Sequence, residues 1–301
     1  MSHNSSKHEA GGFKGKKRTF SGFNYINQFF ESPEHYKSRA PLAESDGRVE
    51  RITPAPQGGT YIVVNGIEHY ADPDSHIEVK EGQEVEQGDQ LADGLVDLED
   101  VVRLRGLGEG RRVFVETGKQ LLDDSNAPAH KRNLEVLARG IVDKVEITDP
   151  DGLGDYLPGD IVSYNALEAS YVPDKDAKKV KLNDKNVNLK GKYLQAPVLH
   201  YTIGTKLTNK MLDHIKRTGI TDELYVSDNE PGFSPVYVRL REVPNKGNTD
   251  FLERANAPYQ AKNYVESAVR GYKTNIKDNI DPFVRMSMPD FAENVDKTGR
   301  F

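Results

Sequence analysis

The part of the sequence that most restricts the fold is "VKEGQEVEQGDQLADG", residues 79–94. Its apolar residues Val79, Val85 and Leu91 are six positions apart, so in an extended chain all three side chains fall on the same face. A glycine follows three residues after each of them, and glycine readily adopts the positive φ that a tight reversal of the chain needs. The segment therefore predicts short strands that fold back at tight turns around one small core.

Similar glycine-rich turns occur in lipoyl and biotin carriers, which raises the question of whether segment 79–94 carries chemistry. A carrier needs a lysine at the tip of an exposed hairpin, flanked by small residues or methionine. The segment offers only Lys80, which precedes the first glycine turn. We therefore interpret these turns as architecture, because a fold does not by itself imply a function.

The composition limits the class of protein. The chain of 301 residues has room for one large domain or two modest ones, and its hydrophobic content of 36% predicts a small core. No apolar run approaches the ~18 residues that span a bilayer, and the first residues do not resemble a signal peptide. Because cysteine is absent from the sequence, disulfides and thiolate zinc sites are excluded. These features predict a soluble protein that is made inside the cell.

The first twenty residues carry a net charge of +4, so the remaining chain carries −10. A basic arm on an acidic body is typical of a segment that meets an acidic surface or nucleic acid, although a solvated terminus has the same composition. If the arm contacts phosphate groups, the candidate residues are Lys14, Lys16, Lys17 and Arg18.

Residues 20–36 contain six of the 25 aromatic residues of the chain. These rings either pack on the protein's own body or anchor it to another subunit. Residues 281–301 also keep several large apolar side chains, and a body of low hydrophobicity with aromatic tails at both ends favours the second explanation. The partner-docking hypothesis names Phe20, Phe23, Tyr25, Phe29, Phe30, Tyr36, Phe291 and Phe301.

From residue 44 the pattern is that of β-structure, and Asn65-Gly66 between two β-branched runs predicts a hairpin. At Asp97 the apolar period becomes helical, with Asp97 as the N-cap and Gly106 as the stop. The next expected elements are helices at 109–125 and 131–140, a strand at 141–148, and either a strand or a helix at 161–171.

A lysine-rich polar loop follows Tyr171. Beyond it, Thr208 is expected to cap a helix that ends at Gly219. The other elements expected in this part are strands at 196–207, 223–227 and 235–240 and a helix at 259–272.

Two polar segments are candidates for chemical sites. The acidic segment "DPDGLGDYLPGD", residues 149–160, offers oxygen ligands, but its spacing does not fit an EF-hand, and Asp and Gly are also preferred in turns. The arginines of "RLRGLGEGRR", residues 103–112, are expected to pair with acidic groups, with contact to a phosphate backbone as the alternative. No nucleophile, base and orienting group occur together, so the sequence indicates no catalytic, cofactor-binding or metal-binding residue.

Five segments in order resemble the C-terminal part of the β′ subunit of bacterial RNA polymerase: "ESDGRVERI", "VKEGQEVEQGDQLADG", "DLEDVVRLRGL", "KRNLEVLARGIVDKVEITDP" and "DYLPGDIV". In that family the first two form part of a barrel-sandwich hybrid module, and the helical run is an excursion from it. The family's magnesium loop, Asn-Ala-Asp-Phe-Asp-Gly-Asp, has no match in this sequence. The chain after residue 205 departs from the family and resembles polymerase-like or virion structural proteins of large tailed phages.

The pattern and the resemblance together predict a mixed α+β fold: a β-rich barrel-sandwich hybrid with a helical excursion, a smaller α/β portion and extended N- and C-terminal arms. The expected segments are a basic and aromatic arm at 1–43, the polymerase-like module at 44–170, a polar loop at 171–194, the α/β portion at 195–242, and a helix with a docking tail at 243–301.

The absence of the magnesium loop and of any other catalytic set predicts a non-catalytic structural protein without a cofactor. We expect it in the virion of a tailed phage, near the portal, neck or tail. Its expected partners are neighbouring subunits, including copies of itself in a ring, with nucleic acid at the basic arm and no membrane. The alternative is an accessory fragment of a split, phage-type multisubunit DNA-directed RNA polymerase.

Overall fold

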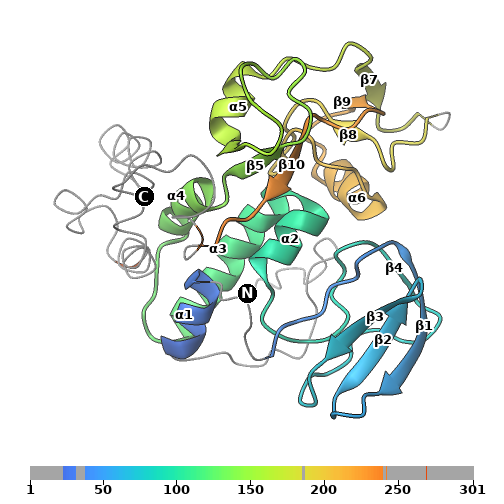
Figure 1. Ribbon diagram of the computed structural model, residues 1–301, viewed down its shortest axis with the longest axis vertical. Coiled ribbons are helices and arrows are strands. Elements are labelled where there is room, and N and C mark those ends of the chain that lie inside the picture. Colours follow the sequence, from blue (N-terminus) through green and yellow to red (C-terminus); the bar gives the residue numbers. More distant parts are fainter. Residues whose placement is uncertain (1–22, 32–37, 185–186, 240–241, 243–268, 270–301) are drawn as a thin grey trace, which may run out of the picture. The chain divides into compact units, whose positions relative to one another are not determined.

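The computed structural model describes residues 23–31, 38–184, 187–239, 242 and 269 (Figure 1). They form two compact units, and each unit combines segments that are far apart in the sequence. Unit 1 contains 38–94 and 173–231, and unit 2 contains 23–31, 95–172 and the described residues from 232 onward. Helices and strands occur in both units, so the predicted mixed α+β fold is confirmed. Among the helices of these described segments, none is long and apolar enough to cross a membrane.

The first part of unit 1 is a four-stranded antiparallel sheet in the order β3-β2-β1-β4. Its strands are β1 (Gly47–Pro54), β2 (Thr60–Val64), β3 (Ile67–Ala71) and β4 (Glu84–Val85). Strands β2 and β3 are joined at Asn65 and Gly66, whose φ angles of 49° and 75° are those of a tight hairpin turn. The predicted Asn-Gly hairpin is confirmed.

The glycine-rich segment folds around the core of this sheet. Val79, Val85 and Leu91 are buried in one cluster with apolar side chains of β1 and β2. Gly82 and Gly88 have φ angles of 81° and 80°, which glycine adopts without the strain that a side chain would cause. Each of their N–H groups donates to a carbonyl of the segment that runs opposite, at 2.7 Å. The predicted buried face and both of these turns are confirmed.

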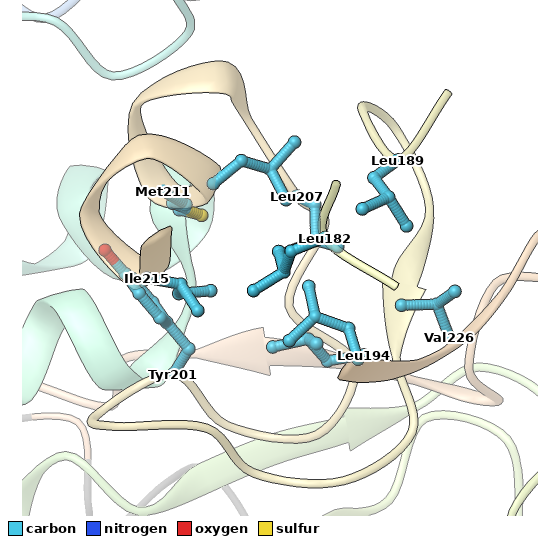
Figure 2. Close-up of a cluster of buried hydrophobic side chains, with 10 residues drawn as sticks. Leu182, Leu189, Leu194, Tyr201, Leu207, Met211, Ile215 and Val226 are labelled. Atoms are coloured by element: carbon cyan, nitrogen blue, oxygen red, sulfur yellow. The ribbon is translucent and has the colours of Figure 1, made fainter. Parts of the chain in front are cut away.

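The second part of unit 1 packs helix α6 (Asn209–Thr218) on a three-stranded sheet in the order β7-β9-β8. The strands are β7 (Lys178–Lys181), β8 (Tyr193–Leu194) and β9 (Glu223–Ser227). Thr208 Oγ1 accepts a hydrogen bond from the N–H of Met211 at 3.3 Å, and Gly219 ends the helix with a φ of 61°, as predicted. Figure 2 shows the core between them, including Leu182, Leu189, Leu194, Tyr201, Leu207, Met211, Ile215 and Val226.

The expectation of a strand at 196–207 is wrong. The chain forms an isolated bridge between Val198 and Tyr201 instead of a continuous ladder. Leu199, in the tight turn between them, has a φ of 57°, which lies in the left-handed region and is incompatible with a strand. The apolar side chains that suggested a strand, among them Tyr201 and Leu207, are buried in the core beside α6.

Unit 2 contains the predicted helical excursion as α2 (Leu98–Arg105), α3 (Leu107–Asp124) and α4 (Lys131–Ile141). Asp97 caps α2 as expected, because its Oδ1 accepts a hydrogen bond from the N–H of Glu99 at 3.0 Å. Gly106, with a φ of 87°, separates α2 from α3. The two helices approach closely at Gly110, where an added Cβ would lie 2.4 Å from Cγ2 of Val102.

Unit 2 also contains a three-stranded antiparallel sheet in the order β10-β5-β6. Its strands are β5 (Lys144–Ile147), β6 (Ile161–Ser163) and β10 (Phe233–Val236). Strand β6 passes directly into helix α5 (Tyr164–Ser170), so the segment that fitted either a strand or a helix forms one after the other. The change occurs at Ser163, whose Oγ accepts a hydrogen bond from the N–H of Ala166 at 3.3 Å.

Helix α1 (Phe23–Glu31) is a local departure from the extended arm that the sequence predicted. Ile26, Phe29 and Phe30 follow the i, i+3, i+4 spacing of a helical face and are buried. The rings of Phe29 and Phe30 lie 5.8 and 5.4 Å from the ring of Phe114 on α3, measured between centroids. The helix is therefore stabilised by packing of its aromatic face on α3. Most other residues of the two predicted arms, and the expected helix at 259–272 except Val269, lie outside the described residues.

Candidate functional site

A buried polar centre in unit 2 joins α3 to the sheet and to α5. Nε of Arg111 donates to the carbonyl of Val142 at 2.8 Å. Its Nη2 lies 3.2 Å from Oδ1 of Asp143 and 3.2 Å from Oδ1 of Asn165. The guanidinium also lies over the ring of Tyr164, 5.5 Å from the centroid. One side chain of α3 thus contacts the end of α4, the start of β5 and the start of α5.

Asp143 is the main acceptor of this centre. Its Oδ2 accepts a hydrogen bond from the hydroxyl of Ser163 at 2.5 Å, and its Oδ1 accepts one from the N–H of Asn165 at 3.0 Å. Burial raises the pKa of Asp143 above its usual value, although the Ser163 hydroxyl and Arg111 act in the opposite direction. Burial likewise lowers the pKa of Arg111. Both charges are held by protein groups in place of water.

The bonding of the centre fits an architectural role. Both oxygens of Asp143 accept hydrogen bonds, and the Arg111 guanidinium is directed at protein acceptors. The hydroxyl of Ser163 donates to the Asp143 carboxylate, and its oxygen caps α5, so its hydrogen-bonding capacity is used within the protein. The centre fixes how α3, the sheet and α5 meet within unit 2.

The other arginines of residues 103–112 also pair with acidic groups. Arg112 contacts Glu109 at 2.8 Å and Glu116 at 2.7 Å, and Arg105 lies 4.0 Å from Glu109. Burial alone would lower the pKa of Arg112, but the hydrogen bonds with Glu109 raise it above the usual value. The expectation that this segment pairs with carboxylates is confirmed, and these arginines are engaged within α3 and α2.

Acidic side chains in unit 1 fix the glycine-rich turns to the second part of the unit. Oδ1 of Asp46 accepts a hydrogen bond from the N–H of Gln87 at 2.8 Å, and its Oδ2 lies 2.6 Å from Nζ of Lys190. Asp89, which lies in the second turn, forms an ion pair with Lys210 of α6. These contacts support the interpretation of segment 79–94 as architecture.

The acidic loop at 149–160 uses carboxylates on its own backbone. Oδ1 of Asp149 accepts a hydrogen bond from the N–H of Asp151 at 3.1 Å, and Oδ2 of Asp160 accepts one from the N–H of Leu157 at 2.9 Å. Such bonds are typical of aspartate in turns. In the part of the chain that the structure describes, no group of three or more His, Cys, Asp or Glu side chains is arranged to hold a metal ion.

The structure shows where some of the predicted docking residues lie. Phe29 and Phe30 are only 2% and 1% exposed, Tyr25 is half-buried, and Phe23 begins α1. The partner-docking hypothesis stays a prediction, and for Phe29 and Phe30 it would require α1 to leave α3. The residues that lie outside the described part are Phe20, Tyr36, Phe291 and Phe301 and the phosphate-contact candidates Lys14, Lys16, Lys17 and Arg18.

Sequence reasoning did not find the polar centre as a unit. Asp143 and Asn165 lie 32 and 54 residues from Arg111, and no spacing rule links residues so far apart. The available signal was local: a serine directly before a helical run, here Ser163, is a typical N-cap.

Comparison with known proteins shows similarity to one subunit of a transcription enzyme. No family model matches the chain. The β′ subunit of DNA-directed RNA polymerase from Endomicrobium trichonymphae is 24% identical over 238 residues, which cover 77% of this chain. The β′ subunits from Elusimicrobium minutum and Clostridioides difficile are 30% and 28% identical over 56% and 52% of the chain. The chain spans only 13–14% of the length of these relatives.

These relatives confirm the resemblance to β′ that the sequence segments indicated. They give no support to the tailed-phage context, and the virion localisation stays an untested prediction. The expectation of a non-catalytic virion component is wrong, because the relatives are named as subunits of a DNA-directed RNA polymerase, which is an enzyme. The alternative expectation, a fragment of a multisubunit polymerase, agrees better with the comparisons. The missing magnesium loop does not exclude a polymerase subunit, because one chain of a multisubunit enzyme need not carry the catalytic residues.

Proposed function

We propose that this chain forms part of a multisubunit DNA-directed RNA polymerase, in which it provides a module similar to a segment of β′. The observation that carries the proposal is the 238-residue alignment, which is longer than either structural unit. The aligned region therefore includes residues of both units, and the similarity extends beyond the glycine-rich module. We further propose that this polymerase is of the split, phage-type form.

The internal contacts suit a module that keeps a fixed shape inside a larger assembly. The Arg111–Asp143 pair fixes the elements of unit 2, and the Asp46–Lys190 pair fixes those of unit 1. The Arg111–Asp143 pair is buried, and buried charge pairs add little net stability but are used to specify geometry, which supports this interpretation. The hydrophobic content of 36% also fits a chain that gains stability from partner subunits.

RNA synthesis by the assembled enzyme is the activity that the proposal assigns, with this chain as one subunit. Its partners are then the other polymerase subunits. The expectation of a ring of identical copies stays an untested prediction.

Purification of the tagged chain from its native source tests the proposal. We expect proteins similar to polymerase subunits to co-purify in fixed proportion, as identified by mass spectrometry. Arg111→Met, which breaks the buried centre, should reduce this co-purification. Arg132→Met is the matched control, because the Arg132 side chain on α4 is 68% exposed. Recovery of the chain alone, or only with proteins unrelated to polymerases, would contradict the proposal.

A further inference from the structure

Strand β7 presents a run of positive charge on the edge of its sheet. Lys178, Lys179 and Lys181 lie on the strand and Lys175 lies in the loop before it, and all four are exposed. We refer to these four residues as the lysine strip. Strand β7 is an edge strand, because the sheet order is β7-β9-β8. Within the described segments, none of the four lysines forms an ion pair.

Alternation along the strands places part of the strip on the face away from the core. Leu224 and Val226 of β9 are buried in the core beside α6, so Tyr225 between them faces the opposite side. Lys179 is the cross-strand partner of Tyr225, and Lys181 lies two residues further along β7. Tyr225 is half-buried, so part of its ring remains exposed. A tyrosine and two lysines therefore share one outer face with Glu223, whereas Lys178, the partner of Val226, lies on the other face.

Acidic side chains lie beside the lysine strip, so the charge balance on the face of Tyr225 has to be compared residue by residue. Residues 175–181 contain four lysines and one acidic residue, Asp176, in a chain whose net charge is −6. Asp174 accepts hydrogen bonds from Ser227 and Asn229 at 2.6 and 2.7 Å, and the Ser227 bond is the main cause of its lowered pKa. Glu223 is the cross-strand partner of Lys181 and is the acidic group of β9 that lies closest along the ladder. On the face of Tyr225 the two lysines therefore outnumber the one glutamate.

We propose that the lysine strip and Tyr225 form a binding surface for single-stranded nucleic acid. Lys179 and Lys181 are two residues apart on an extended strand, so their Cα atoms are about 6.8 Å apart. That spacing is comparable with the spacing of successive phosphates along an extended nucleic-acid strand. Lysines that follow the backbone, beside an aromatic ring on which a base stacks, are the combination that binds single strands. Lysines on edge strands also hinder aggregation, but that role does not involve the tyrosine.

Fluorescence anisotropy with the purified full chain and labelled oligouridylate tests this surface at several salt concentrations. The test variant replaces the two lysines that share the face of Tyr225, Lys179 and Lys181, with glutamine. The matched control removes the same charge at exposed positions elsewhere, namely Lys80 and Lys216.

We expect the test variant to bind at least about tenfold more weakly at about 0.1 M salt, and the control variant to change less than about twofold. The salt slope of the test variant should also fall by about 1.4, since each of two phosphate contacts on a single strand contributes about 0.7. The basic residues at the N-terminus are present in every variant and cannot cause the difference. Equal binding by the test and control variants, or no binding by the wild type, would overturn the proposal.

Tyr225 separates nucleic-acid binding from general attraction of anions. Tyr225→Ala should weaken binding roughly fivefold or more, whereas Tyr225→Phe keeps the ring and the affinity. Melting temperatures of both variants show whether the alanine variant is still folded. If the wild type binds polyglutamate as tightly as RNA of equal charge, the surface serves acidic proteins and the proposal fails. The binding assay uses the chain alone, so a negative result would leave the polymerase proposal unaffected. Failed co-purification would likewise leave the proposed nucleic-acid surface unaffected.

Discussion

Replacement of Arg111 by methionine tests whether the buried polar centre holds unit 2 together. The substitution keeps much of the side-chain volume and removes the guanidinium that bonds Val142, Asp143 and Asn165. The Asp143 side chain is only 9% exposed, so its carboxylate would remain buried without its cation. Removing one partner of a buried pair costs about 3–5 kcal/mol, which is a large part of the stability of a typical domain, roughly 5–15 kcal/mol.

Urea denaturation followed by circular dichroism measures this loss. We expect Arg111→Met to lower the free energy of unfolding by about 3 kcal/mol or more. The melting temperature should fall by about 6–12 °C, because ~1 kcal/mol shifts it by about 2–4 °C in a unit of this size. Arg132→Met is the matched control: the Arg132 side chain is 68% exposed and lies 3.5 Å from Glu135. Arg132→Met should lower the free energy of unfolding by less than about 1 kcal/mol.

A double-mutant cycle with Asp143→Asn isolates the pair itself. If the two side chains interact as the structure shows, Arg111→Met together with Asp143→Asn should cost at least about 1 kcal/mol less than the sum of the single losses. Additive losses, or equal losses from Arg111→Met and the exposed control, would refute the reasoning.

Three further predictions concern single positions. Gly110→Ala should destabilise unit 2 by about 1–3 kcal/mol, because the new Cβ would lie 2.4 Å from a methyl group of α2. Gly118→Ala on the same helix meets its nearest atom at 3.5 Å and should stabilise by up to about 1 kcal/mol, and equal effects in urea denaturation would contradict this contrast. Leu199→Asn should raise the thermal stability by about 0.5–1 kcal/mol, since the φ of 57° strains leucine more than asparagine, and a lower melting temperature would contradict the strain. Burial alone would raise the pKa of Asp46, but the hydrogen bond with Lys190 lowers it below the usual 3.8. The pair's stabilisation should therefore be present above about pH 4 and lost as the pH falls further, and Asp46→Asn should remove that dependence in urea denaturation at each pH.

Features that depend on neighbouring residues could be predicted from the sequence. The Asn65-Gly66 turn follows from the backbone preferences of two adjacent residues, and the structure confirms it. The start and end of α6 follow from Thr208 and Gly219 in the same way. The burial of Val79 and its partners follows from alternation along an extended chain.

Contacts between distant segments could not be predicted, because a polar side chain does not specify its partner. Arg111 was visible as part of an arginine-rich segment, but nothing local joined it to Asp143. Asp46 and Lys190, which form an ion pair in unit 1, are also far apart in the sequence. All the helices of the excursion lie between them along the chain. Residues 196–207 show the opposite failure: their apolar pattern predicts a strand, whereas Tyr201 and Leu207 are apolar because they enter the core beside α6, and Leu199 has a left-handed φ.

The claim that this chain is part of an RNA polymerase is tested most directly by template-directed RNA synthesis with and without it. The measurement compares the native complex, the same complex depleted of the chain, and the depleted complex after addition of the purified chain. We expect depletion to abolish most nucleotide incorporation and addition of the wild type or Arg132→Met to restore it. Full RNA synthesis by the depleted complex, or absence of the chain from every active fraction, would contradict the claim.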